Sequence, residues 1–372
     1  MQAGSGRGFG GGTGSRKHAR RNTGEHGGWQ KVLEPSRRSS APRSTLQDAE
    51  RETDVGRESE DVEKIKKGLI GRSQALKLVD KYLEGDDERS AVAVARALVG
   101  IEGGLRAFGT AQQVPQRQYT LQDLRLNKIE PVRFLSPTDS TLNKVRTSAQ
   151  VALLSGIGSL YYFGHWDMTQ LLGLVVGLLF VGSVDQIVNG GGGEGLILDT
   201  AGNLLSSRYR DRVSQHEAGH FLVSYLLGVL PRAYTLSSLN ALTKYGALNL
   251  QAGTRFVDYD FQEEVKTGKL QSKTVDSFTC IALAGVATEY LRFDLAEGGL
   301  NDINQLDSLL RSLGFSQKKA DSQIRWAVLN TVTLLRRHEK AHRALVGAMI
   351  AGKSVGECIG VIEGELKNVT DI

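Results

Sequence analysis

Apolar positions recur every three or four residues from residue 61 onward, which is the spacing of an amphipathic helix. A Gly-Asp-Asp sequence at residues 85–87 interrupts the pattern, and a second helix is predicted from residue 90 to 108. We expect this helical region, residues 46–111, to be a small helical domain or an adaptor surface. The next residues, 112–147, contain three of the six prolines and predict an extended connector.

Two longer apolar blocks follow, at residues 149–163 and 171–188. Each is close to the lower limit of about 17 residues for crossing a bilayer. Each is also rich in glycine, as membrane helices often are. Trp166 and two tyrosines lie at the connection, where an aromatic belt would meet the membrane surface. The pattern predicts a two-helix transmembrane hairpin over residues 148–188, and the alternative is a pair of buried core helices in a soluble protein.

The pattern changes again after the hairpin. A glycine-rich run at residues 189–195 predicts a flexible hinge. An apolar helix is expected over residues 213–230, and a mixture of β-branched and aromatic residues with Gly and Asn predicts short strands and loops over residues 233–261. Helices are expected from residue 274 nearly to the end. The predicted fold class of residues 189–372 is therefore mainly α with a small β-sheet.

The strongest chemical motif is His-Glu-Ala-Gly-His at residues 216–220. Residues four apart share one face of a helix, so His216 and His220 can reach one metal ion. Glu217 lies one residue along, where its carboxylate can take a proton from a metal-bound water. This is the H-E-x-x-H arrangement of zinc peptidases, with two metal ligands and a catalytic carboxylate. Gly219 removes a side chain where another backbone could approach closely.

A second H-E-x-x-H sequence occurs at residues 338–342. Its two histidines are surrounded by basic residues, namely Arg336, Arg337, Lys340 and Arg343. Positive charge raises the cost of holding a dication and is typical of a solvated helix face. We therefore interpret this copy as a chance match without a metal.

Residues 347–354 match the phosphate-binding pattern G-x-x-x-x-G-K-S. A phosphate-binding loop joins a strand to a helix, because the loop backbone must cradle the phosphates at the helix N-terminus. Here the pattern follows a predicted helix, so we interpret it as a chance match and expect no ATP binding.

Two histidines leave a catalytic zinc one protein ligand short. A third histidine at the H-E-x-x-H-x-x-G-x-x-H spacing is absent, because Val223 and Leu226 occupy those positions. Either the missing ligand is then a carboxylate or the site is incomplete. Several carboxylates are available downstream, Glu289, Asp294 and Asp302 among them.

Residues 213–362 resemble the FtsH-type zinc metallopeptidases. In that family HEAGH is followed by a helix with a GG-x-A-A-E-E sequence, a glycine loop and Asn-Asp-Leu. The resemblance implies that Asp302 is the third zinc ligand beside Asn301, that Glu289 matches the first glutamate of the helix, and that the fold is a helical bundle with a zincin-like HExxH helix. This sequence departs from the family pattern with Ala-Gly in place of Gly-Gly and with Thr288 in place of alanine.

FtsH proteases also carry an ATPase module between their membrane segments and the peptidase. Too few residues separate the second apolar block from His216 to hold such a module. The resemblance therefore implies a membrane-anchored, Zn²⁺-dependent metalloendopeptidase without its own motor. Its expected partners are unfolded or peptide substrates, with a partner AAA ATPase protease subunit or a second copy of the chain as further partners. The alternative is a non-catalytic FtsH-like scaffold subunit of an organellar membrane protease complex.

The formal net charge of +5 is unevenly distributed, because residues 1–45 carry nine basic and two acidic side chains. The basic pI is thus a property of the tail and does not indicate nucleic-acid binding. This tail is rich in Arg, Ser and Gly and lacks an apolar run, which is typical of an organelle transit peptide, with a merely disordered tail as the alternative. The combination of this tail, the hairpin and a motor-less FtsH-like peptidase resembles plastid proteins of plants. That resemblance implies a chloroplast membrane, thylakoid or envelope, with the mitochondrial inner membrane as the alternative.

The only two cysteines, Cys280 and Cys358, lie in separate apolar helical segments. They predict no disulfide framework and no C-x-x-C metal site, and we expect both to be buried as small hydrophobic residues.

Overall fold

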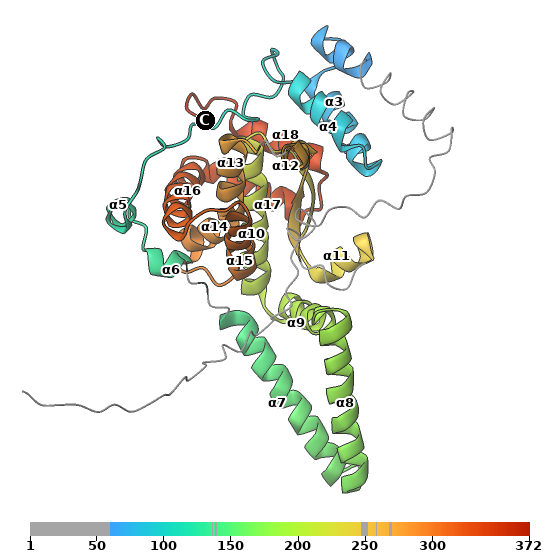
Figure 1. The fold of residues 1–372 in the computed structure, drawn as a ribbon. Helices are drawn as coiled ribbons and strands as arrows, with labels where there is room; N and C mark the ends of the chain where they lie inside the picture. The colour runs from blue at the N-terminus through green and yellow to red at the C-terminus, as the bar shows by residue number, and fades with distance from the viewer. Residues whose placement is uncertain (1–59, 136, 138–139, 247–251, 258, 268–269) are drawn as a thin grey trace, which may run out of the picture.

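The computed structural model describes most of the chain after the predicted transit tail, namely residues 60–135, 137, 140–246, 252–257, 259–267 and 270–372. Nearly all of its regular structure is helical, and the described residues form one sheet of two strands. The predicted class, mainly α with a small sheet, is confirmed. Figure 1 shows a body of packed helices from which a pair of long helices projects.

Helix α10 (Ser207–Leu226) runs through the middle of the body. Its last three and a half turns are buried on all sides, which explains why the apolar pattern around HEAGH is continuous rather than one-sided. It packs against α14 (Ala284–Phe293) and α17 (Glu339–Ile350). A Cβ atom on Gly219 would lie 2.8 Å from the Ala284 backbone carbonyl oxygen of α14 and 2.2 Å from Thr288 Oγ1, so the predicted close approach of another backbone at this glycine is confirmed.

Four further helices of the C-terminal half surround this central layer. They are α13 (Ser272–Ala282), α15 (Leu300–Ser312), α16 (Gln317–Arg337) and α18 (Val355–Glu365). Both cysteines are buried among them without a disulfide, as expected.

The sheet consists of β1 (Pro231–Thr235) and β2 (Gly253–Phe256), which pair antiparallel. The prediction of strands and loops alone over this stretch was incomplete, because α11 (Ser238–Tyr245) lies between the strands and α12 (Tyr259–Thr267) follows them. The overlooked signal is Ser237, whose hydroxyl accepts a hydrogen bond from the Asn240 N–H and caps α11.

The helices before the hairpin pack onto the C-terminal half. α3 (Arg72–Glu84) lies against α18, and it pairs with α4 (Glu88–Ala97). The helix predicted to reach residue 108 ends at Ala97, because Gly100 and Gly103 adopt positive φ angles just beyond it. Residues 60–111 thus contribute to the same apolar core as the C-terminal half.

The predicted connector wraps around the body. The Val114 N–H donates to Asn330 Oδ1 at 2.9 Å, and the Val114 carbonyl accepts from the Trp326 indole N–H at 3.1 Å. Two short helices interrupt it, α5 (Leu121–Leu126) and α6 (Pro131–Leu135). The prediction of an extended segment was therefore only partly correct.

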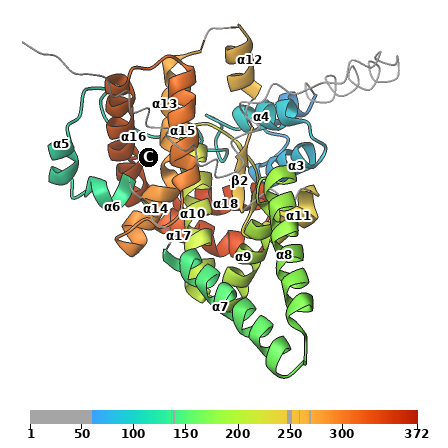
Figure 2. The same ribbon diagram turned by 60° about the horizontal axis from the view of Figure 1, so that its bottom comes forward.

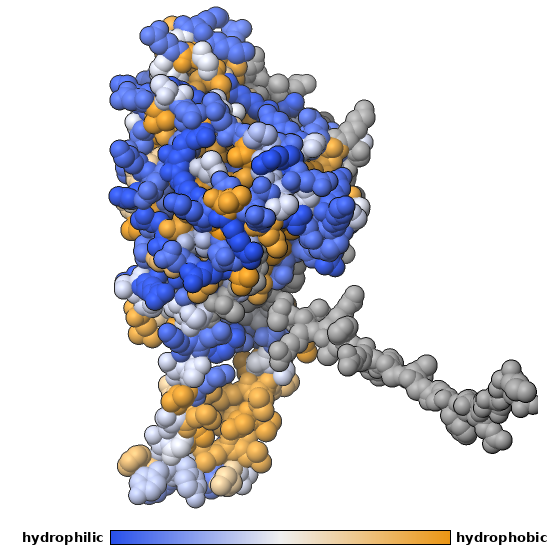
Figure 3. All heavy atoms as spheres, turned by 90° about the vertical axis from the view of Figure 1, so that its left-hand side faces the viewer, coloured by the Kyte–Doolittle hydropathy of each residue, from blue (hydrophilic) through white to orange (hydrophobic). Residues whose placement is uncertain are grey.

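The projecting pair consists of α7 (Ser140–Tyr162) and α8 (Met168–Val188), joined by a short turn (Figures 1 and 2). Leu171 is the one buried residue in the two helices, so they do not belong to the protein core. Figure 3 shows the apolar colour concentrated on this pair and a mostly hydrophilic body above it. Among the described residues, α8 alone is long and apolar enough to cross a membrane, since the first turns of α7 are polar.

The glycine-rich run predicted as a hinge is a capped turn between two helices. Gly191, with φ 81°, is the N-cap of α9 (Gly192–Leu205), which begins inside the run. The Asp185 carboxylate of α8 accepts hydrogen bonds from the N–H groups of Gly193 at 3.0 Å and Glu194 at 3.1 Å. A carboxylate at a helix N-terminus satisfies free N–H groups and complements the helix dipole, which the sequence interpretation overlooked.

The hairpin is inserted into the body rather than placed ahead of it. Residues 60–135, before the hairpin, and residues 192–372, after it, contribute to one continuous cluster of buried apolar side chains. The expected order of a hairpin followed by a self-contained domain of residues 189–372 therefore leaves out part of the core.

Candidate metal centre

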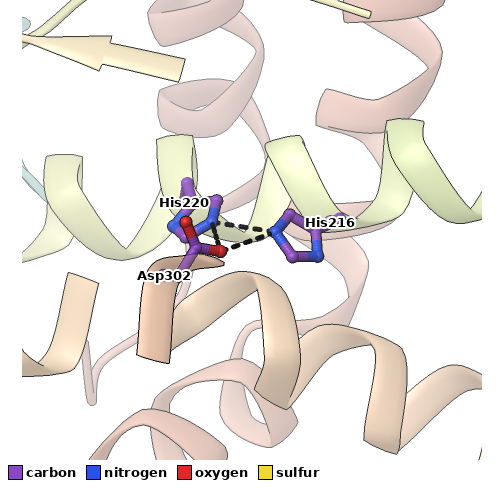
Figure 4. A group of neighbouring side chains, drawn as sticks. All are labelled: His216, His220 and Asp302. Carbon is purple, nitrogen blue, oxygen red and sulfur yellow. Dashed lines mark hydrogen bonds and ion pairs between the residues drawn. The ribbon is translucent and has the colours of Figure 1, made fainter. Parts of the chain in front are cut away.

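Three side chains from two helices converge on one point (Figure 4). His216 and His220 lie on successive turns of α10, and Asp302 lies in the first turn of α15. The His216 Nε2 atom is 3.1 Å from His220 Nε2 and 3.1 Å from Asp302 Oδ2, and His220 Nε2 is 3.3 Å from the same oxygen. Within the described part of the chain, no other group of three such side chains could hold a metal ion.

The other nitrogen of each imidazole ring fixes its orientation. His220 Nδ1 lies 2.8 Å from the Ile281 carbonyl oxygen, and His216 Nδ1 lies 2.8 Å from Glu289 Oε1. Both partners are acceptors, so each Nδ1 carries the proton and each Nε2 presents a lone pair. Two imidazole lone pairs and the Asp302 carboxylate oxygen then face one another. Such an arrangement is stable only when a positive charge lies between them.

The donor set fits a tetrahedral divalent ion. Zn–N and Zn–O bonds of about 2.0–2.2 Å at tetrahedral angles place neighbouring ligand atoms about 3.3 Å apart. The three observed separations of 3.1, 3.1 and 3.3 Å agree with that spacing. Two imidazoles and one carboxylate also leave a fourth position for water or substrate, as in catalytic zinc sites.

A buried carboxylate supports His216 from behind. Glu289 Oε2 accepts hydrogen bonds from Arg212 at 2.8 Å and from the backbone N–H groups of Glu297 at 2.9 Å and Gly298 at 3.1 Å. Burial opposes ionisation of Glu289, but the hydrogen bond and charge of His216, with the backbone N–H groups of Glu297 and Gly298, lower its pKa to about 2. Arg212 was not among the predicted site residues, although it lies four residues before His216 and thus on the same face of α10.

The electrostatics of the site favour one added positive charge. Burial alone would lower the pKa of His216, but the adjacent Asp302 and Glu289 carboxylates raise that pKa well above its usual value. Burial likewise opposes ionisation of Asp302, yet the two histidines hold its pKa below its usual range. The site therefore binds a proton or a metal cation between its carboxylates.

Glu217 is buried beside the converged ligands and contacts the small sheet. Its Oε2 atom lies 2.9 Å from the Thr254 hydroxyl of β2, and burial raises the pKa of the Glu217 carboxyl group. Thr254 also reaches the Glu217 carbonyl oxygen, at 3.1 Å, so β2 holds both the side chain and the backbone of this residue. This contact was not predicted, because Thr254 of β2 lies 37 residues after Glu217 in the chain.

Glycines make room for the ligands. A Cβ atom on Gly285 of α14 would lie 2.1 Å from His216 Nε2, and one on Gly298 would lie 2.5 Å from Glu289 Oε1. Gly299 adopts φ 83° immediately before α15 and turns the chain so that Asp302 reaches the site. Only the second residue of the Ala284-Gly285 pair must be glycine to leave space for His216. Ala-Gly can therefore stand where the Gly-Gly pattern would be expected.

The second H-E-x-x-H copy is buried rather than solvated, so that part of its interpretation was wrong. His338 lies at the junction of α16 and α17, and the His342 Nε2–H donates to the Gln215 carbonyl of α10 at 3.0 Å. Burial lowers the pKa of each imidazole to about 4. Both rings are therefore neutral packing groups at neutral pH, and no third ligand joins them among the described residues.

The phosphate-loop pattern lies in a helix–turn–helix, between α17 and α18, and the expected helical context is confirmed. Asp80 accepts hydrogen bonds from the Ser354 hydroxyl at 2.6 Å and from the Gly356 N–H at 2.7 Å. Glu357 completes a capping box with Ser354. Two carboxylates therefore occupy the helix N-terminus where a phosphate group would bind.

A scan against protein-family models found no match to this chain, and searches of curated proteins and of solved structures found none either. The resemblance to FtsH-type peptidases therefore rests on the residues of this chain alone.

Proposed function

We propose that this protein is a membrane-anchored zinc metalloendopeptidase without an ATPase motor of its own. The observation that carries the proposal is the convergence of two imidazole lone pairs and a carboxylate oxygen from His216, His220 and Asp302. Glu217 lies next to this group on α10, in the position of a general base. An intact ligand set with a buried carboxylate beside it favours catalysis over a purely structural scaffold.

In the proposed reaction the chain supplies binding, orientation and proton transfer. Zinc held there would act as a Lewis acid that polarises a peptide carbonyl and acidifies a water molecule. Glu217 would accept the proton of the attacking water and return it to the amine of the leaving peptide. Burial raises the pKa of Glu217, which makes its carboxylate a stronger base, and Thr254 holds its orientation. Glu289 and Ile281 keep both Nε2 atoms directed at the ion.

The shared core supports a hairpin that crosses the membrane twice. Residues 60–135 and 192–372 contribute to one apolar core, so both segments lie on the same side of any membrane. A chain that crosses through α8 must therefore return through α7, although the first turns of α7 are polar. The length of α8, 21 residues, corresponds to about 31 Å and matches the hydrocarbon thickness of a bilayer.

The phosphate-loop pattern follows helix α17 rather than a strand, and Asp80 occupies the position of a phosphate group. Both observations support a peptidase that does not hydrolyse ATP itself. It would act on unfolded or short substrates, or beside a partner AAA ATPase. Its proposed location is a chloroplast membrane, which the resemblance of the tail, the hairpin and a motor-less peptidase to plant plastid proteins favours, with the mitochondrial inner membrane as the alternative.

The test uses the full chain in detergent, because residues 60–135 complete the core. Zinc content and hydrolysis of casein and of peptides are measured for the wild type, Glu217→Gln and Asp302→Asn. We expect one zinc per chain, activity lost with zinc retained in Glu217→Gln, and weakened zinc binding in Asp302→Asn. Zinc without hydrolysis, even with an added partner ATPase, would favour the scaffold function. A chain without zinc would refute the site.

A further inference from the structure

Helix α9 exposes an apolar stripe at the root of the hairpin. Ile197, Leu204 and Leu205 are 67 %, 76 % and 82 % exposed. Residues 197 and 204 are seven apart, two helical turns, and therefore lie on one face. Three large aliphatic side chains this exposed on one short helix form a contiguous apolar surface, which proteins rarely leave facing water.

The opposite face of α9 is fixed to the body. The buried Asp199 carboxylate accepts a hydrogen bond from the Tyr209 hydroxyl of α10 at 2.8 Å and another from the Ser238 N–H of α11 at 2.6 Å. Gly202 lies under the Tyr209 ring, where an added Cβ would be 3.1 Å from the ring. The apolar stripe therefore has a set position relative to the helix that carries the metal ligands.

The stripe is continuous with the proposed membrane segment. The capped turn at Asp185 leads directly from α8 into α9, and Figure 1 shows α9 at the level where the hairpin leaves the body. Exposed basic side chains flank this level on the neighbouring helices, namely Lys144 and Arg146 on α7 and Arg208 and Arg210 on α10. Two of them also pair with carboxylates, Arg146 with Glu194 of α9 and Arg208 with Glu297. Apolar residues bordered by Lys and Arg are typical of a helix that lies in a membrane interface.

We infer that α9 lies in the interface of the same bilayer that the hairpin enters, with Ile197, Leu204 and Leu205 inserted among the lipids. The inference rests on the proposed membrane anchoring and deepens the proposed peptidase activity by naming its substrate class. Contact with a bilayer accounts for the stripe, its position beside α8 and its flanking charges together.

This contact sets the height of the metal centre above the membrane. Helix α10 begins at Ser207, two residues after α9 ends, and runs in roughly the same direction as α8 in Figures 1 and 2. His216 follows nine residues later, a rise of about 14 Å. About four extended residues span that distance. A metal centre at this height would act on polypeptide segments that emerge from the same membrane.

A spacer series examines the substrate class. In vesicles that contain the wild-type protein, peptides anchored to lipid carry one cleavable bond either two or six residues from the anchor. We expect the closer bond to be hydrolysed at least tenfold more slowly. Equal rates for the two bonds would overturn the assigned height of the site.

Depth-dependent quenching tests the contact itself without relying on activity. Both native cysteines are buried, so a single introduced cysteine can be labelled with an environment-sensitive fluorophore in the full chain. Leu204→Cys reports on α9, Phe180→Cys on the hairpin, and Leu126→Cys on an exposed apolar residue of α5. The vesicles contain phosphatidylcholine and phosphatidylglycerol at 3:1, with nitroxide groups placed either at the headgroup or deep in the acyl chain.

We expect the Leu204 label to be quenched by headgroup nitroxides, the Phe180 label by deep nitroxides, and the Leu126 label by neither. If the Phe180 label is quenched but the Leu204 label is quenched no more than the Leu126 label, α9 does not contact the bilayer. That result would overturn the interfacial contact and leave the proposed anchor intact. If the Phe180 label is also unquenched, the proposed membrane anchor itself fails.

Discussion

The Nδ1 atom of His216 lies 2.8 Å from one carboxylate oxygen of Glu289, and Arg212 lies 2.8 Å from the other. This chain of contacts fixes the ring and keeps its Nε2 lone pair free for a metal ion. Groups that orient a metal-bound histidine typically change metal affinity 10- to 100-fold when they are replaced.

We therefore expect Glu289→Gln to weaken zinc binding about 10- to 100-fold, because the neutral amide removes the negative charge that orients the His216 ring. Competition with a chromophoric chelator at fixed pH measures the affinity. Glu339→Gln is the matched control, since Glu339 also pairs with an arginine, Arg292, but on an exposed surface. An affinity equal to that of the control would contradict the supporting role of Glu289.

Replacing Gly285 by alanine should abolish zinc binding, because the added methyl group would overlap His216 Nε2. Gly347→Ala, in the middle of α17, provides the control, since an added Cβ meets nothing within 4 Å there. The control should bind zinc normally and gain up to about 1 kcal/mol of stability from the higher helix propensity of alanine. Zinc content and urea denaturation measure the two effects. Normal zinc content in Gly285→Ala would show that the space at His216 is larger than described.

Asp80→Ala should destabilise the fold by about 1–3 kcal/mol, because it removes two acceptors from the N-terminus of α18. Nucleotide binding should be absent in the wild type and in Lys353→Ala alike. Urea denaturation in detergent and titration with a fluorescent ATP analogue provide the measurements. Asp307→Ala, which removes only an exposed ion pair with Arg311, should change stability by less than about 1 kcal/mol. ATP binding that depends on Lys353 would overturn the chance-match interpretation.

The buried His342 predicts a loss of stability in mild acid. Its pKa is about 4 in the folded chain and 6.5 as the ordinary value, so between these pH values the unfolded chain binds a proton that the folded chain does not. The stability contribution is complete above pH 6.5 and falls by about 2 kcal/mol between pH 7 and pH 5. His342→Gln keeps a donor for the Gln215 carbonyl but does not titrate. The free energy of unfolding of the wild type should therefore fall between pH 7 and pH 5 by about 2 kcal/mol more than that of the variant, and equal falls would refute the assignment.

Local patterns predicted the parts of this protein that local physics determines. The helical spacing of His216 and His220 and the space at Gly219 follow from one helix, and the exposed α8 follows from an unbroken apolar run. The place of Asp302 beside the two histidines could be predicted only through a resemblance, because nothing in the spacing alone separates Asp302 from Glu289 or Asp294. The structure places Glu289 behind His216 and Asp302 in front of it, a difference made by the turn at Gly299.

The errors arose where distant contacts decide the conformation. Basic neighbours made the second H-E-x-x-H appear solvated, but the helix turns its arginines outward and packs His342 against α10. The glycine run appeared flexible because glycine alone lacks conformational preference, whereas Asp185 satisfies its N–H groups. The helical region before the hairpin appeared independent, because its packing partner α18 lies far away along the chain.

The insertion of the hairpin within one core has a consequence for how the chain folds. The pairing of α3, which ends at Glu84, with α18, which begins at Val355, closes a loop of about 270 residues, and closing long loops costs entropy and slows folding. The hairpin brings the two halves of that loop together, since Arg146 at its first helix lies 3.1 Å from Glu194 just after its second. Entry of the hairpin into a bilayer would therefore act as a crosslink that shortens the search of the two halves for each other. Under the proposed membrane anchoring, the helical body is thus expected to fold faster after insertion of the hairpin than before it.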